Sequence, residues 1–298
     1  MVRVKRPSKF LFFCGGAQEI HNNAKAANLR DYLLRVRPIK TKYPIVLAEK
    51  ATQLYRETEY EDLITFEEDI ARIASVVLVI AESPGSLAEL GAFASNDIIR
   101  PALRVVIPSH HADAESFVAL GPIRRIKNYK RENLGIYPWK QHATGGLNVS
   151  TAKPHYKEIV TFINGHLNRI PNSTPYSHLR EARLFYVVYW VIHQSLAISP
   201  KILNDCVLSL LSEVTPSDIR KKIYCMEMAG WIKRVSYSDK DYFYSLYDED
   251  PFEYSYKDGV VERSFVRRKL IAQAGIKKVE SLPKRVVHEA AAARISAP

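Results

Sequence analysis

The chain has 298 residues, 47% of them hydrophobic and 25% charged, and a formal net charge of +11 at pH 7. This is the profile of a soluble globular protein with room for one large or two ordinary domains. Its longest apolar runs fall far short of the roughly 20 residues that span a bilayer, and its first residues do not resemble a signal peptide, so we expect a cytoplasmic protein without a membrane segment.

Short apolar runs and amphipathic segments alternate along the first 110 residues. The runs at 9–14, 43–49, 76–82 and 103–108 predict strands, and the segments at 24–37, 63–74 and 86–96 predict helices. Continuous apolar strands alternating with helices indicate a parallel sheet covered on both faces, that is, a doubly wound α/β fold. Ligands bind such sheets at the carboxyl ends of the strands. The residues at that rim are Gly15, Gly16, Glu49, Glu82, Ser83, Gly85 and Ser86.

The next segment is less regular. We interpret 109–150 as covering loops with one more edge strand at 125–130, and 155–170 as an amphipathic helix that closes the domain. The stretch after it is rich in Pro, Ser, Thr and Asn, which is typical of a linker. The expected layout is therefore a first domain at 1–170, a linker at 171–177 and a second domain at 178–298.

The second domain is expected to be smaller and mostly helical. Residues 181–196 are apolar all round, which predicts a core helix, and Pro200 and Pro216 stand at the first position of two further helices. Two β-rich pieces flank the turn at 238–241, so the order is helix, strand, turn, strand, as in a winged helix. We expect the tail at 289–298 to be a frayed helix or disordered.

Basic residues gather in local clusters, and a basic protein of this size often binds a polyanion. Ordinary solvated surface is the alternative for any one cluster. The candidates for nucleic-acid or partner contact are Arg124, Arg125 and Lys127 in the first domain and Arg220, Lys221 and Lys222 at the recognition-helix position of the second.

The three cysteines, Cys14, Cys206 and Cys225, are scattered and odd in number. Their spacing fits neither a disulfide framework nor a CxxC metal pair, so we expect small buried apolar residues. No His, Cys and acid grouping has metal-ligand spacing, and we expect no metal site.

The segment SPGSLAELGAFA carries a carboxylate with two interpretations. Ser86 and Glu89 form S-x-x-E, the pattern of a capping box, which by itself needs no ligand. The Pro84-Gly85 turn at the end of a central strand, followed by a helix N-terminus, is however a natural phosphate site. Glu89 one turn into that helix would face the same crevice. One carboxylate could serve both purposes.

These residues carry a resemblance. FFCGG near the start, an acidic residue after the second strand and AESPGSLAELGAFA resemble the nucleoside deoxyribosyltransferase-like family, and within it the effector proteins encoded with bacterial retrons. Those effectors join such a domain to a winged-helix-like one. The resemblance is specific at 76–96, moderate at 10–20, and architectural beyond 175.

The resemblance implies cleavage of an N-glycosidic bond at C1′ of a sugar, with Glu89 as the catalytic carboxylate. It places Gly15, Gly16, Ser83, Gly85 and Ser86 in the sugar- and phosphate-binding loops, while acids at Glu49 and Glu82 could equally be structural. It implies NAD or a nucleotide as the substrate, no cofactor, and control by a reverse transcriptase bound to its branched RNA–DNA product, the msDNA. Homo-oligomers or filaments of such complexes are compatible with it.

The chemistry agrees with an acid at this place, because C1′–N cleavage passes through an oxocarbenium-like sugar that a carboxylate stabilises or traps. Nicotinamide leaves NAD as a neutral ring without a proton donor, whereas a nucleobase would usually need one. No residue has the spacing expected of a proton donor, and His21, His142 and Asp97 are candidates only by their proximity in sequence, which favours NAD over a plain nucleoside. The alternatives are a deoxynucleoside or nucleotide transferase or hydrolase, and a non-catalytic nucleotide sensor coupled to a winged-helix DNA binder.

Overall fold

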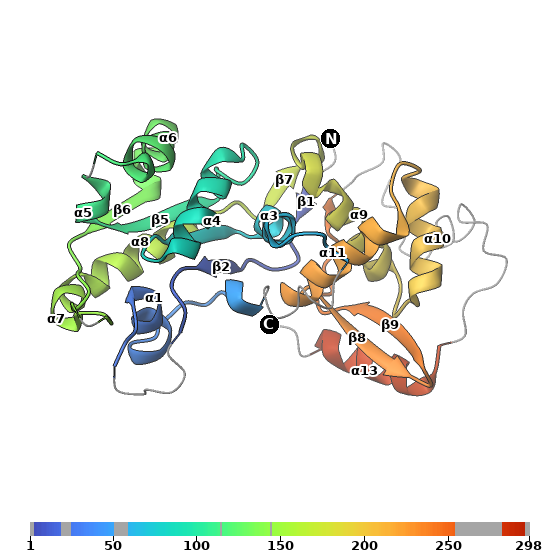
Figure 1. Ribbon diagram of the computed structural model, residues 1–298. Coiled ribbons are helices and arrows are strands. Elements are labelled where there is room, and N and C mark those ends of the chain that lie inside the picture. Colours follow the sequence, from blue (N-terminus) through green and yellow to red (C-terminus); the bar gives the residue numbers. More distant parts are fainter. Residues whose placement is uncertain are drawn as a thin grey trace. The chain divides into compact units, whose positions relative to one another are not determined.

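The computed structural model describes residues 3–18, 25–50, 59–113, 115–143, 145–253 and 282–295 (Figure 1). The chain forms two units, and neither is continuous in sequence. We call residues 9–56 and 62–170 the sheet unit, and residues 1–8, 57–61 and 171–298 the helical unit. The predicted boundaries at 170 and 177 stay predictions, and the two units are described separately.

The sheet unit is built on five parallel strands in the order β3-β2-β4-β5-β6. They are β2 (Leu11–Cys14), β3 (Ile45–Leu47), β4 (Val76–Ile80), β5 (Leu103–Pro108) and β6 (Leu134–Tyr137). The side chains of β2, β4 and β5 are buried throughout, which explains why these strands read as unbroken apolar runs. The prediction of an α/β fold with a parallel sheet is confirmed.

Helices cover both faces of this sheet. On one face α1 (Leu29–Asp31), the π-helical turn η1 (Tyr32–Val36) that continues it, and α8 (Tyr156–Asn168) pack in one core with Leu11 and Phe13. Phe12 points to the opposite face, where its ring meets that of Phe93 at 6.5 Å. Phe93 belongs to α4 (Pro84–Ser95), and α3 (Leu63–Ile73) packs beside α4.

The edge of the sheet differs from the prediction. Of residues 125–130, expected as a strand, 125–129 lie in α6 (Arg124–Tyr129), with Lys130 as its C-cap, and α6 continues the π-helical turn η2 (Ala119–Ile123). Ile123 and Ile126 are buried three residues apart while their neighbours Arg124 and Arg125 are exposed, so the period is helical. The edge strand is β6 instead. Short helical pieces complete the unit: α5 (Ser109–Ala112), η3 (Arg131–Asn133), α7 (Val149–Ala152) and η4 (Lys153–His155).

The helical unit contains the first strand of the chain. β1 (Arg3–Lys5) lies between β7 (Ser173–Pro175) and β10 (Phe252–Glu253), antiparallel to both. Part of the segment predicted as a linker therefore forms β7. Two 3₁₀ turns, η5 (Tyr176–His178) and η6 (Arg180–Ala182), lead from it to the helices.

Three helices and a hairpin form the body of the helical unit. They are α9 (Arg183–Gln194), α10 (Pro200–Leu210), α11 (Pro216–Met228), β8 (Ile232–Tyr237) and β9 (Lys240–Ser245). Ser238 and Asp239 take positive φ in the two-residue turn between the strands. The predicted order of helix, strand, turn and strand is confirmed.

The C-terminal tail and the three cysteines also had sequence-based predictions. Residues 289–295, predicted as a frayed helix or disordered, are helical and belong to α13 (Lys284–Ile295), where Val286 and Ala290 bury against Val235 and Tyr242 of the hairpin. Residues 296–298 lie outside the described part. All three cysteines are free and buried, as predicted. Within the described residues no helix has the length and apolar character to cross a membrane.

Candidate functional site

The strand order places the candidate site between two strands. With its strands numbered along the chain, the sheet has the order 2-1-3-4-5, so the direction of winding reverses between β2 and β4. In doubly wound sheets ligands bind at this switch point, at the carboxyl ends of the strands. Gly15 and Gly16 follow β2 directly, and Glu82 and Ser83 follow β4.

A buried arginine that the sequence did not single out joins the loops at this end of the sheet. Arg30, in the first turn of α1, is 1% exposed. Its guanidinium donates to the carbonyl oxygens of Phe13 at 2.9 Å and Gly16 at 3.1 Å, and it forms a bidentate ion pair with Glu49. Glu49 is thus held by Arg30, and its role in substrate binding stays a prediction.

The Gly15-Gly16 pair has a packing reason that is independent of any ligand. A Cβ on Gly15 would stand 2.5 Å from Cδ of Arg30, and a Cβ on Gly16 would stand 2.5 Å from Nδ2 of Asn28. Real Cβ atoms do not approach other atoms so closely, so side chains here would push α1 away from the strand. A role of these glycines in substrate binding stays a prediction.

Glu82 has a structural role. Its carboxylate accepts hydrogen bonds from the backbone amides of Leu29 at 2.8 Å and Arg30 at 2.9 Å, the first amides of α1. These groups have no partner inside the helix, so Glu82 satisfies them from the neighbouring strand. Burial raises the pKa of Glu82 to about 7, and the donated amide hydrogen bonds oppose this rise.

The predicted capping box between Ser86 and Glu89 is wrong. Helix α4 starts one turn earlier, with Pro84 at its first position and Ser83 as the N-cap. The box is formed by Ser83 and Ser86: the Ser83 hydroxyl accepts from the Ser86 amide at 3.2 Å, and the Ser86 hydroxyl accepts from the Ser83 amide at 2.9 Å. Proline favours this register because its missing N–H and fixed φ suit the first helical position. Glu89 therefore takes no part in capping.

Glu89 instead is half-buried and lies beside a buried acid, Glu67. Oε2 of Glu89 is buried without a hydrogen-bond partner in the described structure. Burial first, and then the charge of Glu67, raises the pKa of Glu89 to about 8, while Arg30 opposes the rise. Glu67 projects from α3, is 6% exposed, and has its own pKa raised to about 7 by burial. Burial raises the pKa of the Cys14 thiol at the end of β2, and both carboxylates raise it further.

Sequence reasoning missed both Glu67 and Arg30. Each is a charged residue beside the apolar positions of a helix that covers the sheet: Glu67 follows the buried Phe66, and Arg30 follows the buried Leu29. A buried charge without a neighbouring partner in sequence is the signal that could have identified them.

The remaining predicted site residues are Gly85 and the suggested proton donors. Gly85 lies in the first turn of α4, where a Cβ would meet no atom within 4 Å. Of the suggested proton donors, Asp97 is ion-paired with Arg100, His142 is exposed, and His21 lies outside the described residues. Within the part of the chain that is described, no three His, Cys, Asp or Glu side chains are arranged to hold a metal ion.

The two basic groups belong to different units and have different surroundings. Arg124 and Arg125 are exposed on α6 of the sheet unit, with Lys127 half-buried between them and the end of the helix. On α11 of the helical unit, Arg220 is ion-paired with Glu59 at 2.5 Å. The ammonium groups of Lys221 and Lys222 lie over the rings of Tyr60 and Phe185 at 5.5 and 5.0 Å.

Comparison with known proteins identifies relatives. The family described as "STM3845 retron effector protein" matches residues 26–234. "Retron Ec86 putative ribosyltransferase/DNA-binding protein" of Escherichia coli is 27% identical over 156 residues, covering 51% of this chain and 50% of that protein. "Retron Ec73 putative ribosyltransferase/DNA-binding protein" of the same organism is 27% identical over 137 residues, covering 44% and 43%. The chain therefore matches about half the length of these curated relatives or less.

Proposed function

This chain belongs to the STM3845 family of retron effector proteins, and on that premise we propose that it is an N-glycosidase that cleaves NAD. The proposed reaction consumes NAD and water, and yields nicotinamide, ADP-ribose and a proton. Glu89 is the proposed catalytic carboxylate. The observation that carries the proposal is a pair of neighbouring acids, the half-buried Glu89 and the buried Glu67, whose charges both add to the rise that burial causes in the pKa of Cys14 at the end of β2, one of the two strands at the switch point.

The proposed chemistry begins with the bond between C1′ and the pyridinium nitrogen. As this bond breaks, its electron pair neutralises the nicotinamide ring, and positive charge develops on C1′ and the ring oxygen of the sugar. A carboxylate at Glu89 stabilises this charge or bonds to C1′ until water replaces it. Its unpartnered Oε2 is the atom available for this contact, since no capping amide occupies it.

The raised pKa of Glu89 fits a site for a cationic substrate. A carboxyl group with a pKa of about 8 is mostly protonated at neutral pH. A pyridinium ring brought beside it favours the ionised form, because opposite charges at short range lower a carboxyl pKa. Substrate binding would therefore release a proton and create the carboxylate that the reaction needs.

A nucleoside or nucleotide is the second candidate substrate, and Glu67 is the observation in its favour. A departing nucleobase usually requires a proton, and a buried carboxyl group with a pKa of about 7 is able to donate one at neutral pH. The two substrates make different demands on this residue. Glu67→Gln should leave NAD cleavage within about tenfold of the unmodified protein, but slow nucleoside cleavage by roughly 10²- to 10⁴-fold.

We propose the retron reverse transcriptase and its msDNA as partners that control the effector. Membership of a retron effector family supports this association, and the names of the curated relatives include DNA binding. The order of α9, α10, α11 and the β8–β9 hairpin supports a winged-helix-like helical unit. A sensor without turnover would bind nucleotide tightly and release no nicotinamide.

The test is chromatography of NAD incubated with purified full-length chain. Nicotinamide should accumulate with the unmodified protein and fall by at least 10³-fold with Glu89→Gln. Glu158→Gln is the matched control, since it makes the same change on the exposed surface of α8. Thermal melting and circular dichroism establish that each variant folds. If folded Glu89→Gln releases nicotinamide at the unmodified rate, the catalytic assignment is wrong.

A further inference from the structure

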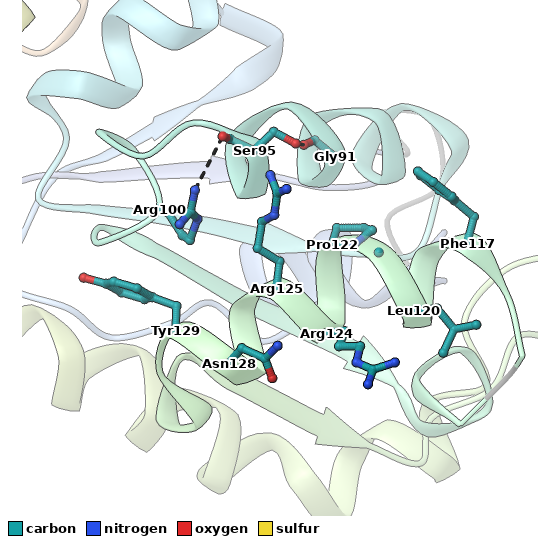
Figure 2. A pocket seen from close by; sticks show the side chains of 11 residues that line it. Gly91, Ser95, Arg100, Phe117, Leu120, Pro122, Arg124, Arg125, Asn128 and Tyr129 are labelled. Atoms are coloured by element: carbon teal, nitrogen blue, oxygen red, sulfur yellow. Dashed lines mark hydrogen bonds between the residues drawn. The ribbon is translucent and has the colours of Figure 1, made fainter.

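A hollow of about 770 Å³ opens on the sheet unit, and neither Glu89 nor Glu67 is among its lining residues (Figure 2). One wall is the later part of α4, through Gly91 and Ser95, and the other is η2 and α6. The hollow is lined by Gly91, Ser95, Arg100, Phe117, Leu120, Gly121, Pro122, Arg124, Arg125, Asn128 and Tyr129.

Large apolar side chains are unusually exposed here. Phe117 is 85% exposed, Leu120 58% and Tyr129 48%, and these are three of the six large hydrophobic side chains exposed in the described part of the chain. Scattered single exposures need no explanation, but a cluster around one hollow marks an interaction surface. Figure 2 shows Phe117 and Tyr129 towards opposite ends of it.

The charge of the hollow is positive. Arg124 and Arg125 are exposed and make no ion pair within the described structure. Arg100 is already engaged: it pairs with Asp97, and its Nε donates to the carbonyl oxygen of Ala94 at 2.8 Å. Among the described residues that line the hollow there is no Asp or Glu. The guanidinium groups of Arg124 and Arg125, which have no carboxylate partner in the described structure, are suited to phosphate.

We propose that this hollow binds single-stranded nucleic acid. Arg124 and Arg125 hold backbone phosphates, and the rings of Phe117 and Tyr129 stack on bases at either end. Cationic and aromatic side chains together are the chemistry of single-strand binding, because unpaired bases expose faces that a duplex keeps stacked. A free mononucleotide would occupy one aromatic end only. The inference concerns binding alone and does not depend on turnover at Glu89.

The test is fluorescence anisotropy with the full-length chain and a labelled 12-nucleotide oligothymidylate, with a duplex of equal length and dTMP as competitors. We expect the single strand to bind more tightly than either. Phe117→Ala should weaken binding by roughly 5- to 100-fold. The double variant Arg124→Gln/Arg125→Gln should weaken it further and lower the slope of log affinity against log salt by about 1.4, since each single-strand phosphate contact contributes about 0.7.

The matched control is Lys153→Gln/Lys157→Gln, which removes the same charge from exposed positions on and near α8. It should change affinity by less than twofold, and thermal melting should show every variant folded. The inference is overturned if the folded Phe117 and Arg124/Arg125 variants bind like the unmodified chain. It is equally overturned if duplex or dTMP competes as well as the single strand, or if no oligonucleotide binds.

Discussion

At the candidate site, Glu89 and Glu67 differ from the neighbouring acids in having no structural partner within the described structure. Two other acids at the same end of the sheet are committed: Glu49 to the guanidinium of Arg30, and Glu82 to the first amides of α1. Glu67 is buried and Glu89 is half-buried; burial raises the pKa of both, and the charge of Glu67 raises the pKa of Glu89 further. Carboxyl groups that are costly to ionise and have no structural partner are those expected to serve chemistry.

The pH dependence of NAD cleavage should reflect this coupling. Since the proposed reaction requires ionised Glu89, kcat/KM should rise with pH and level off above about pH 8. Glu67→Gln removes the neighbouring negative charge, so the rise should move to lower pH. Initial rates from pH 5 to 9.5 measure both profiles. A rise that stays at the same pH in Glu67→Gln would show that the two acids do not interact.

The same burial makes the protein less stable as pH increases. Folding raises the pKa of Glu89 from the ordinary 4.5 to about 8, so its ionisation at alkaline pH favours the unfolded chain. The stability that protonated Glu89 contributes is fully present below pH 4.5 and is lost as pH rises through 8. At pH 9 the free energy of unfolding of Glu89→Gln should therefore exceed that of the unmodified protein by on the order of 1 to 3 kcal/mol. At pH 5 the two proteins should differ little. Urea melts at both pH values test this.

At the scale of elements, the first residue of a helix was predicted correctly for α11 and wrongly for α4. Thr215-Pro216 was expected to open α11, and it does, because Thr215 caps and Pro216 takes the first position. The same pattern, a cap residue followed by proline, occurs at Ser83-Pro84, but it overlaps the S-x-x-E pattern that begins at Ser86. In the structure Ser83 is extended and caps the helix, while Ser86 already lies inside it.

The cap of α4 gives a direct test. Ser83→Ala removes the hydroxyl that accepts from the Ser86 amide and should lower the free energy of unfolding by about 1 kcal/mol. Under the rejected register the change would be close to neutral, since Ser83 would lie outside the helix. Ser95→Ala, at the exposed end of the same helix, is the control. Urea titrations at pH 7 compare the three proteins.

For the molecule as a whole, the sequence predicted the parallel sheet and the later helices and hairpin, because each has a local pattern. What it could not predict are features that depend on distant segments. Arg30 and Glu49 are 19 residues apart, and Glu67 and Glu89 come from different helices. The strand β1 has the same limitation, since three residues become a strand only beside β7 and β10.

The segment before α3 has a long-range attachment that can be tested. Tyr60 is 6% exposed, and its hydroxyl lies 3.4 Å from the Cys225 sulfur and 3.3 Å from the Lys221 carbonyl oxygen of α11. Tyr60→Ala should destabilise the helical unit by roughly 3 kcal/mol, as for other buried aromatic residues. Tyr60→Phe should cost about 1 kcal/mol. Equal effects of the two variants would contradict burial of the ring.

The interrupted course of the chain through its two units also constrains how the protein can be recombined. A chimera of two relatives joined at residue 170 would take β7, β10 and α11 from one parent, but β1, Glu59 and Tyr60 from the other. The helical unit would then be assembled from unmatched sequences. Exchanging the helical unit as a whole would require its three segments, residues 1–8, 57–61 and 171–298, to be moved together.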